Sequence, residues 1–165
     1  MSSAHQNLSS EKMVNAGSID HFHFTVIVAE WNREITSELE KGCTETLIAN
    51  GADSNKIRVI SVPGSWELVS AATMAAHMSN ADAVICIGVV VRGDTPHFDY
   101  ICQGVTQGLA NLCSTQTTPV IYGVLTVNNM HQALDRCGGI HGNKGDEAAA
   151  TAIKMALLKE KFLHT

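Results

Sequence analysis

The sequence is poor in charged and aromatic residues, and it lacks long apolar segments. Charged residues make up 16% of its 165 residues, aromatic residues make up 5%, and the formal net charge is −5. This balance, without any cluster of lysine and arginine, argues against a protein that binds nucleic acid. No apolar run approaches the ~20 residues that span a membrane, and the polar first twenty residues do not resemble a signal peptide. We therefore expect a cytoplasmic protein with one folded core.

Cysteine is present, but it lacks the pattern of a disulfide framework or of a metal site. The chain has five cysteines, an odd number, and no CxxC motif. Histidine and cysteine nowhere recur at the spacing that binds zinc. We therefore expect reduced, buried thiols and no metal ion.

Apolar, β-branched runs alternate with helical patterns four times along the chain. The expected strands cover residues 22–29, 56–62, 83–91 and 119–125. The expected helices cover residues 34–50, 66–78, 96–114 and 146–163, with a short helix that ends near residue 137. This alternation predicts a single α/β domain with a four-stranded parallel sheet and helices on both faces. Residues 1–20, rich in Ser, Asn and Gln, are expected to be a disordered leader before a domain at 21–165.

The stretch that joins the third strand to the next helix is the most unusual in the chain. A buried apolar run ends abruptly in six residues: Arg92, Gly93, Asp94, Thr95, Pro96 and His97. Pro96 suits the first helical position, with Thr95 as the N-cap. The free N–H groups of a helix N-terminus bind anions, and histidine transfers protons near neutral pH. These residues predict an anion site with His97 as the proton carrier and Arg92 as a candidate anion ligand.

Unusual residues also follow the other expected strands. They are Trp31 after the first, Ser65 to Glu67 after the second and Thr126 to Asn128 after the fourth. Ligands of open parallel sheets bind outside the carboxyl ends of the strands, so we expect the site at this edge. Two alternatives stay open from the residues alone. Trp31 either packs in the core or stacks on a flat ring, and Glu67 either complements a helix dipole or accepts hydrogen bonds from a polyol.

Two basic residues near the C-terminus have simple interpretations. Residues 142–145 (GNKG) lack the order of a P-loop and do not follow a strand, so Lys144 is consistent with a solvated linker residue. Arg136, near the end of a short helix, is consistent with a charge that compensates the helix dipole.

Six motifs occur in an order that resembles the lumazine synthase (6,7-dimethyl-8-ribityllumazine synthase) family. They are AEWN (29–32), VPGSWEL (62–68), IGVVVRGDTPHFDY (87–100), PVIYGVLT (119–126), QALDRCGG (132–139) and GNKGDEAA (142–149). The resemblance implies a three-layer αβα fold with a flavodoxin-like four-stranded parallel sheet. It also implies a transferase of riboflavin biosynthesis that needs no cofactor. The family condenses 5-amino-6-(D-ribitylamino)uracil with L-3,4-dihydroxy-2-butanone 4-phosphate and releases phosphate and water.

The resemblance implies a role for each candidate site residue. Trp31 stacks on the pyrimidine ring, and the ring and ribityl chain contact Ser65, Trp66 and Glu67. Backbone groups of three consecutive residues read the uracil edge: Val89, Val90 and Val91. The butanone phosphate binds to Asp94, Thr95 and Arg136, which leaves Arg92 without that role. His97 shuttles protons.

The resemblance also implies assembly of several copies. Tyr122, where the family often has Phe, lines the uracil pocket from a neighbouring subunit, and Lys144 supports the same interface. Family members form pentamers, and many build a 60-subunit icosahedral shell. The absence of proline before Pro63 and a short linker at 138–145 favour the shell. Riboflavin synthase is a further candidate partner.

Two other functions are compatible with parts of the sequence. One is a flavodoxin-like flavin-binding module, although the loop after the first strand, residues 30–33, lacks the usual Ser/Thr/Gly-rich phosphate site. The other is a catalytically silent shell protein, against which five intact site residues argue: Trp31, Glu67, Thr95, His97 and Arg136.

Overall fold

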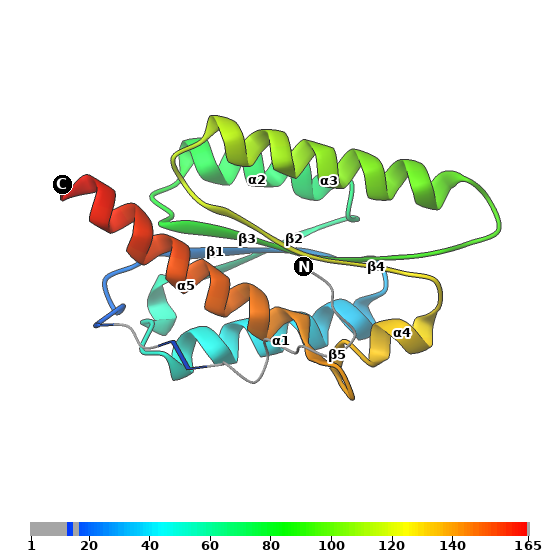
Figure 1. Ribbon diagram of the computed structural model, residues 1–165, viewed down its shortest axis with the longest axis horizontal. Coiled ribbons are helices and arrows are strands. Elements are labelled where there is room, and N and C mark those ends of the chain that lie inside the picture. Colours follow the sequence, from blue (N-terminus) through cyan, green and yellow to red (C-terminus); the bar gives the residue numbers. More distant parts are fainter. Residues whose placement is uncertain (1–12, 15–16, 165) are drawn as a thin grey trace.

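A four-stranded parallel sheet lies between two layers of helices (Figure 1). The structure, a computed structural model, describes residues 13–14 and 17–164. The strands are β1 (Phe24–Ala29), β2 (Ile57–Val62), β3 (Ala83–Val91) and β4 (Val120–Val127). They lie in the order β2-β1-β3-β4, and every neighbouring pair is parallel. The predicted α/β class and the predicted sheet are confirmed.

Helices cover both faces of the sheet, as predicted. They are α1 (Arg33–Ala49), α2 (Glu67–Met78), α3 (His97–Thr115), α4 (Met130–Leu134) and α5 (Lys144–Leu163), with a short 3₁₀ turn at Ser54–Lys56. Figure 1 shows α2 and α3 on one face and α1, α4 and α5 on the other. Each face has its own apolar cluster, with Leu68 and Leu109 in the first and Leu39 and Ile153 in the second.

Strand β3 lies in the interior of the sheet, between β1 and β4. Its residues from Ala83 to Val89 are all buried, because helices cover both faces of this part of the strand. Such burial explains why the run is continuously apolar rather than alternating. Its last two residues, Val90 and Val91, are only half-buried. The strand therefore leads from the core to the open edge where its loop begins.

Helices α1 and α5 approach each other closely through two glycines. A Cβ atom on Gly145 would overlap the carbonyl of Leu39, and one on Gly42 would lie 2.8 Å from Oδ1 of Asp146. Asp146 is buried there and accepts a hydrogen bond of 3.1 Å from Oγ1 of Thr46. This contact positions the first turn of α5, which carries Lys144.

The region after β4 differs from the prediction. The short helix α4 ends at Leu134 rather than near residue 137, and a small hairpin follows, formed by β5 (Cys137–Gly139) and β6 (Gly142–Asn143). Gly138 and Gly142 have φ angles of 124° and 75°, in the region that favours glycine. Strands of two or three residues are too short to leave a periodic pattern.

Helix α5 begins at Lys144 rather than at residue 146, because the side chain of Asn143 caps it by accepting from the Gly145 N–H at 2.7 Å.

The start of α3 also differs by one residue from the prediction. The carbonyl of Pro96 accepts the first helical hydrogen bond, from the Asp99 N–H at 3.0 Å, so Pro96 is the N-cap. Thr95 therefore lies in the loop before the helix and does not cap it.

The expected leader lies largely outside the described residues, which omit positions 1–12 and 15–16. Within the described part, Ile19 is buried and belongs to the same apolar cluster as β1. Core packing thus begins slightly before residue 21. The leader and the cytoplasmic location stay predictions.

In the part of the chain that the structure describes, no helix combines the length and the apolar character that crossing a membrane requires.

Candidate active site

A pocket of about 450 Å³ lies where the chain leaves the carboxyl ends of β1, β2 and β3. β1 and β3 are neighbours in the sheet, but the chain forms β2 between them, so their following loops diverge. Such switch points are the usual ligand sites of open α/β sheets. The pocket collects nine of the predicted residues: Trp31, Ser65, Trp66, Glu67, Val89, Val90, Val91, Thr95 and His97.

The loop after β1 presents the indole of Trp31 to solvent beside the pocket. The side chain is 72% exposed, which decides against a core role. The backbone N–H of Trp31 donates to the carbonyl of Pro63 at 3.2 Å, so the loops after β1 and β2 are joined. Asn32, with φ of 58°, then turns the chain into α1. The Trp31 ring is thus held at the rim with a face free to stack.

The turn between β2 and α2 supplies the polar wall of the pocket. Ser65 is buried, and its hydroxyl donates to the carbonyl of Val89 at 3.4 Å. Glu67 follows in the first turn of α2 and is half-buried. The indole of Trp66 packs over Gly104 of α3, where a Cβ atom would collide with it. These contacts fix Ser65 and Trp66 relative to β3 and α3.

The end of β3 offers backbone groups to the pocket. Its register with β1 ends at Ile87, whereas its register with β4 continues through Val91. Beyond Ile87, the side of the strand that faced β1 therefore borders the pocket. Backbone N–H and C=O groups of this kind can bind the edge of a planar amide ring.

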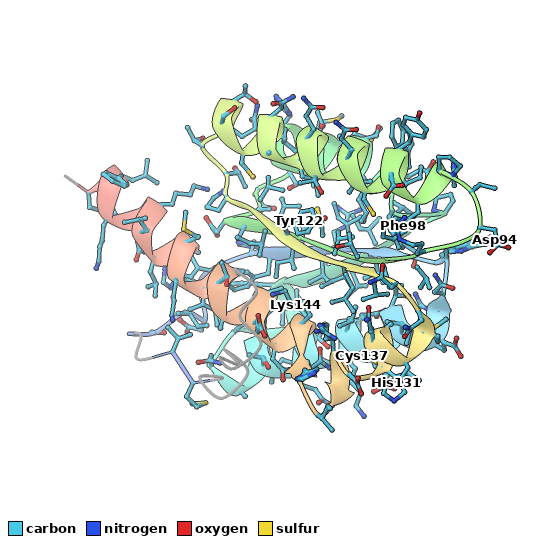
Figure 2. The ribbon with its side chains drawn as sticks, turned by 45° about the vertical axis from the view of Figure 1, so that its right-hand side comes forward. Asp94, Phe98, Tyr122, His131, Cys137 and Lys144 are labelled. Atoms are coloured by element: carbon cyan, nitrogen blue, oxygen red, sulfur yellow. The ribbon has the colours of Figure 1, made fainter. Side chains whose placement is uncertain are left out.

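The loop and first turn after β3 place Thr95 and His97 in the same pocket. Both side chains are exposed, and Gly93 and Phe98 also line the cavity. Asp94 is exposed and is not among the lining residues. Figure 2 shows Asp94 at the outer edge of this loop, whereas Phe98 points from α3 toward the sheet. Gly93 and Thr95, on either side of Asp94, line the pocket, whereas Asp94 does not.

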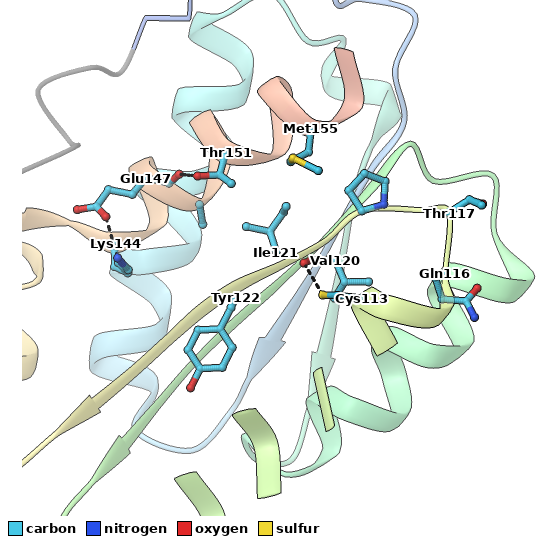
Figure 3. Close-up of a pocket in the computed structure, with 12 residues that line it drawn as sticks. Cys113, Gln116, Thr117, Val120, Ile121, Tyr122, Lys144, Glu147, Thr151 and Met155 are labelled. Carbon is cyan, nitrogen blue, oxygen red and sulfur yellow. Dashed lines mark hydrogen bonds and ion pairs between the residues drawn. The ribbon is translucent and has the colours of Figure 1, made fainter. Parts of the chain in front are cut away.

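Tyr122 and Lys144 lie in a different pocket, of about 500 Å³, along the edge strand β4 (Figure 3). The Tyr122 hydroxyl is 2.9 Å from Oγ1 of Thr106, and burial raises the pKa of this phenol. Nζ of Lys144 donates to Oε2 of Glu147 at 2.8 Å. Lys144 is therefore a residue of the first turn of α5, not of a solvated linker.

Arg136 lines neither of these two pockets. It is half-buried just after α4, and its Nη1 donates to the carbonyl of Gln132 at 3.1 Å. Its own carbonyl accepts from the Lys144 N–H at 2.9 Å, so Arg136 and Lys144 are joined through the small hairpin. One copy of the chain thus holds the predicted residues in two separate groups.

Sequence reasoning did not assign five of the lining residues to the site, and it missed the surroundings of Arg92. The five residues are Asn32, Pro63, Gly64, Phe98 and Ile101. The guanidinium of Arg92 is paired with Asp99, so it does not point freely toward an anion. Arg92 and Asp99 are seven positions apart, on either side of a loop. No helical or strand periodicity in the sequence indicates that these two side chains pair.

The cysteines are all free thiols, three of them buried: Cys43, Cys86 and Cys137. Burial raises the pKa of Cys86 to about 12. The expectation of buried thiols is wrong for Cys113, which is exposed. Within residues 13–14 and 17–164, no group of three or more His, Cys, Asp and Glu side chains is placed to hold a metal ion.

Known proteins match the chain over nearly its whole length. The family model described as 6,7-dimethyl-8-ribityllumazine synthase matches residues 21–160. A protein of that name from Phocaeicola vulgatus is 48% identical over 165 residues, covering 100% of this chain and 98% of its own. One from Porphyromonas gingivalis is 50% identical over 159 residues, 96% of this chain and 99% of its own. One from Bacteroides fragilis is 54% identical over 132 residues, 80% of this chain and 92% of its own.

Proposed function

The chain belongs to the 6,7-dimethyl-8-ribityllumazine synthase family, and from this we propose how its two groups of residues form one active site. The chain is a transferase of riboflavin biosynthesis. It condenses 5-amino-6-(D-ribitylamino)uracil with L-3,4-dihydroxy-2-butanone 4-phosphate, releasing phosphate and water.

The pyrimidine substrate occupies the pocket at the ends of β1 and β3 in this proposal. The exposed indole of Trp31 stacks on its ring, since a flat ring buries apolar area against it. Backbone groups of Val89 to Val91 pair with the uracil edge, beyond the end of the β1 register. Ser65, Trp66 and Glu67 contact the ring and the ribityl chain, with the Glu67 carboxylate accepting from hydroxyl groups.

The butanone phosphate binds next to the same pocket, at the loop before α3. The backbone at Asp94 and the hydroxyl and N–H of Thr95 donate to the phosphate, close to the N-terminus of a 19-residue helix. His97 lies in the first helical turn and lines the same cavity. A single histidine therefore reaches the region where the two substrates meet.

The chemistry requires several proton transfers between these substrates. The pyrimidine amine attacks the ketone, and water leaves as a Schiff base forms. Removal of a proton then expels phosphate, and the resulting enol tautomerises to a ketone. The second ring closes when the ribityl-bearing amine attacks that ketone and a second water leaves. We assign these transfers to His97, because histidine accepts and donates protons near neutral pH. Holding two substrates in reactive geometry contributes much of the remaining acceleration, roughly 7–11 kcal/mol in favourable systems.

A second copy of the chain completes the site. The observation that carries this part is the separation of the predicted residues: Tyr122 and Lys144 line another pocket, and Arg136 lines neither. A phosphate clamp that combines Thr95 with Arg136 therefore needs a neighbouring copy. We propose a pentamer, assembled into a 60-subunit shell with riboflavin synthase as a candidate partner. The exposed apolar side chains Tyr100, Leu134 and Ile140 support extensive subunit contacts.

Complementation between two defective variants tests the shared site. We expect His97→Ala and Arg136→Ala each to be slow, but their co-assembly to restore activity to about a quarter of wild type, because random arrangement leaves about that share of interfaces with both sides intact. The control co-assembles His97→Ala with the double variant His97→Ala/Arg136→Ala, which contains no intact site. Activity of the first mixture at the mean of its two parents would contradict a site shared between subunits.

A further inference from the structure

Arg92 lies at this edge of the sheet and makes several contacts, although it has no role in the reaction proposed above. Its Nη1 and Nη2 donate to the two carboxylate oxygens of Asp99, at 3.3 and 2.9 Å. Its Nε donates to Oδ1 of Asn128 at 3.2 Å, and its backbone N–H donates to the carbonyl of Val127 at 2.9 Å. The guanidinium carbon also lies 4.1 Å from the centre of the Phe98 ring.

These contacts join three separate segments of the chain. Arg92 itself follows β3, Asp99 and Phe98 belong to the first turn of α3, and Asn128 follows β4. The fork of the guanidinium matches a carboxylate with two parallel hydrogen bonds, a geometry that an ammonium group does not reproduce. Stacking on Phe98 adds a cation–π contact to the same turn. The first turn of α3 is thus tied to both neighbouring strands by one side chain.

The turn that Arg92 holds is the one that carries His97. Thr95 and His97 lie between Arg92 and the Phe98–Asp99 pair along the chain, and Phe98 lines the same pocket as both. Each of the three guanidinium nitrogens already donates within this chain. Arg92 therefore has the contacts of a residue that orients a loop, rather than those of a free anion ligand.

We propose that Arg92 is a positioning residue: its two-pronged pairing with Asp99 sets the placement of His97 and Thr95 against the bound substrates. This inference rests on the proposed role of His97. A displacement of a reacting group by about 1 Å can cost about 10²-fold in rate, so loss of the fork reduces turnover without removing any group that touches substrate. A positive charge alone does not suffice to position His97 and Thr95, because a lysine at this position would keep the charge but would lack the guanidinium fork and the stacking on Phe98.

The test compares Arg92→Lys with Asp99→Asn, each in the wild-type and in the His97→Ala background. In the wild-type background we expect kcat to fall about tenfold and the KM for the butanone phosphate to rise, with the KM for the pyrimidine within about twofold. In the His97→Ala background we expect Arg92→Lys to change kcat less than about twofold, because the group that it positions is gone. Arg58→Lys, at an exposed arginine of β2, is the matched control and should behave as wild type.

Three results would overturn the proposal. The first is a kcat of Arg92→Lys and Asp99→Asn equal to that of the Arg58→Lys control. The second is a full tenfold effect of Arg92→Lys that persists in the His97→Ala background, since Arg92 would then act independently of His97. The third is an unchanged kcat in His97→Ala alone, which also removes the proposed role of His97 and so is distinguishable from the other two. Thermal unfolding of each variant, expected within a few degrees of wild type, separates positioning from loss of folding.

Discussion

The hydroxyl of Tyr122, on β4, lies 2.9 Å from Oγ1 of Thr106, on α3. The family resemblance places Phe at this position in many relatives, so the additional hydroxyl needs a partner, and the chain provides one itself. The Tyr122 ring remains 37% exposed and lines the pocket along the edge strand. The hydrogen bond therefore holds the ring in place while part of the ring stays exposed at the surface of the chain.

Tyr122→Phe tests whether the ring or the hydroxyl matters. We expect this variant to lose about 1 kcal/mol of unfolding free energy or less and to keep its KM for the pyrimidine, because Thr106 is exposed and can bind water instead. Tyr122→Ala should raise that KM about tenfold, since it removes the whole ring. Thr106→Val is the control and should match Tyr122→Phe. Equal losses of activity in Tyr122→Phe and Tyr122→Ala would show that the hydroxyl itself contacts substrate.

Substitutions of Trp31 test whether its indole stacks on the pyrimidine substrate. We expect Trp31→Ala to weaken binding of the pyrimidine by about 1–3 kcal/mol, the usual range for stacking of a base on an aromatic ring. Trp31→Phe should retain most of the affinity, and the KM for the butanone phosphate should change little in both variants. Titration calorimetry with the pyrimidine alone measures the effect. An unchanged affinity in Trp31→Ala would remove Trp31 from the binding site.

His97→Ala should slow the enzyme without abolishing turnover. Acid–base groups contribute about 10²–10⁴-fold in general, and we expect a loss at or below the lower limit of this range, about 10- to 100-fold, because orientation of the two substrates is retained. Fluorescence of the lumazine product, followed across pH at saturating substrates, gives kcat. His77→Ala, on an exposed histidine of α2, serves as the control. Complete loss of turnover with both substrates still bound would contradict the idea that orientation of the substrates supplies much of the acceleration.

Alkaline pH should destabilise the fold through Cys86. Burial raises its pKa to about 12 from the value near 9 that an unfolded chain has. Below about pH 9 the Cys86 thiol is protonated in both the folded and the unfolded state, so its full contribution to the free energy of unfolding is present. Between pH 9 and 12 the folded state binds more protons than the unfolded state, so the free energy of unfolding falls by about 1.4 kcal/mol per pH unit from this thiol.

Denaturant titrations from pH 8 to 11 check this dependence. We expect a shallower pH slope in Cys86→Ala, by about the same 1.4 kcal/mol per unit, because alanine does not ionise. Cys113→Ala, at an exposed position, should retain most of the wild-type slope. Identical slopes in wild type and Cys86→Ala would show that this thiol does not contribute.

Assembly is measured directly by light scattering. We expect a particle of about 60 subunits, since closed point-group symmetry buries the exposed apolar side chains of every copy equally. The measurement should cover a range of pH and of inorganic phosphate concentration. A species of only five subunits under all these conditions would contradict the shell but not the shared site, which complementation tests separately.

The strand ends illustrate how much of the site could be predicted from the sequence. The apolar run of β3 and the β-branched run of β1 predict buried parallel strands, because burial on both faces demands apolar residues without alternation. Parallel strands end at the same edge, so Trp31 and His97 are expected to meet although they are 66 positions apart in the sequence. The structure places both in one pocket. Local pattern and a general rule of α/β topology sufficed to predict that these two residues lie together.

Other features depend on contacts between distant parts of the chain. The β5–β6 hairpin is too short for periodicity, and the start of α5 depends on a cap by Asn143. The pairing of Arg92 with Asp99, and of Tyr122 with Thr106, requires the relative placement of α3 and its neighbouring strands. No period in the sequence encodes the direction of a single side chain.

The sequence by itself thus determined the α/β class, the order of strands and helices along the chain, and the edge of the sheet at which most of the candidate site residues gather, because these follow from hydrophobic period and connectivity. Only the tertiary structure decided that Arg92 holds the first turn of α3, and that Tyr122, Arg136 and Lys144 lie apart from Trp31 and His97 in one copy. Both depend on the packing of α3, α4 and α5 against β4, where distances between side chains are set by the whole core rather than by any local segment.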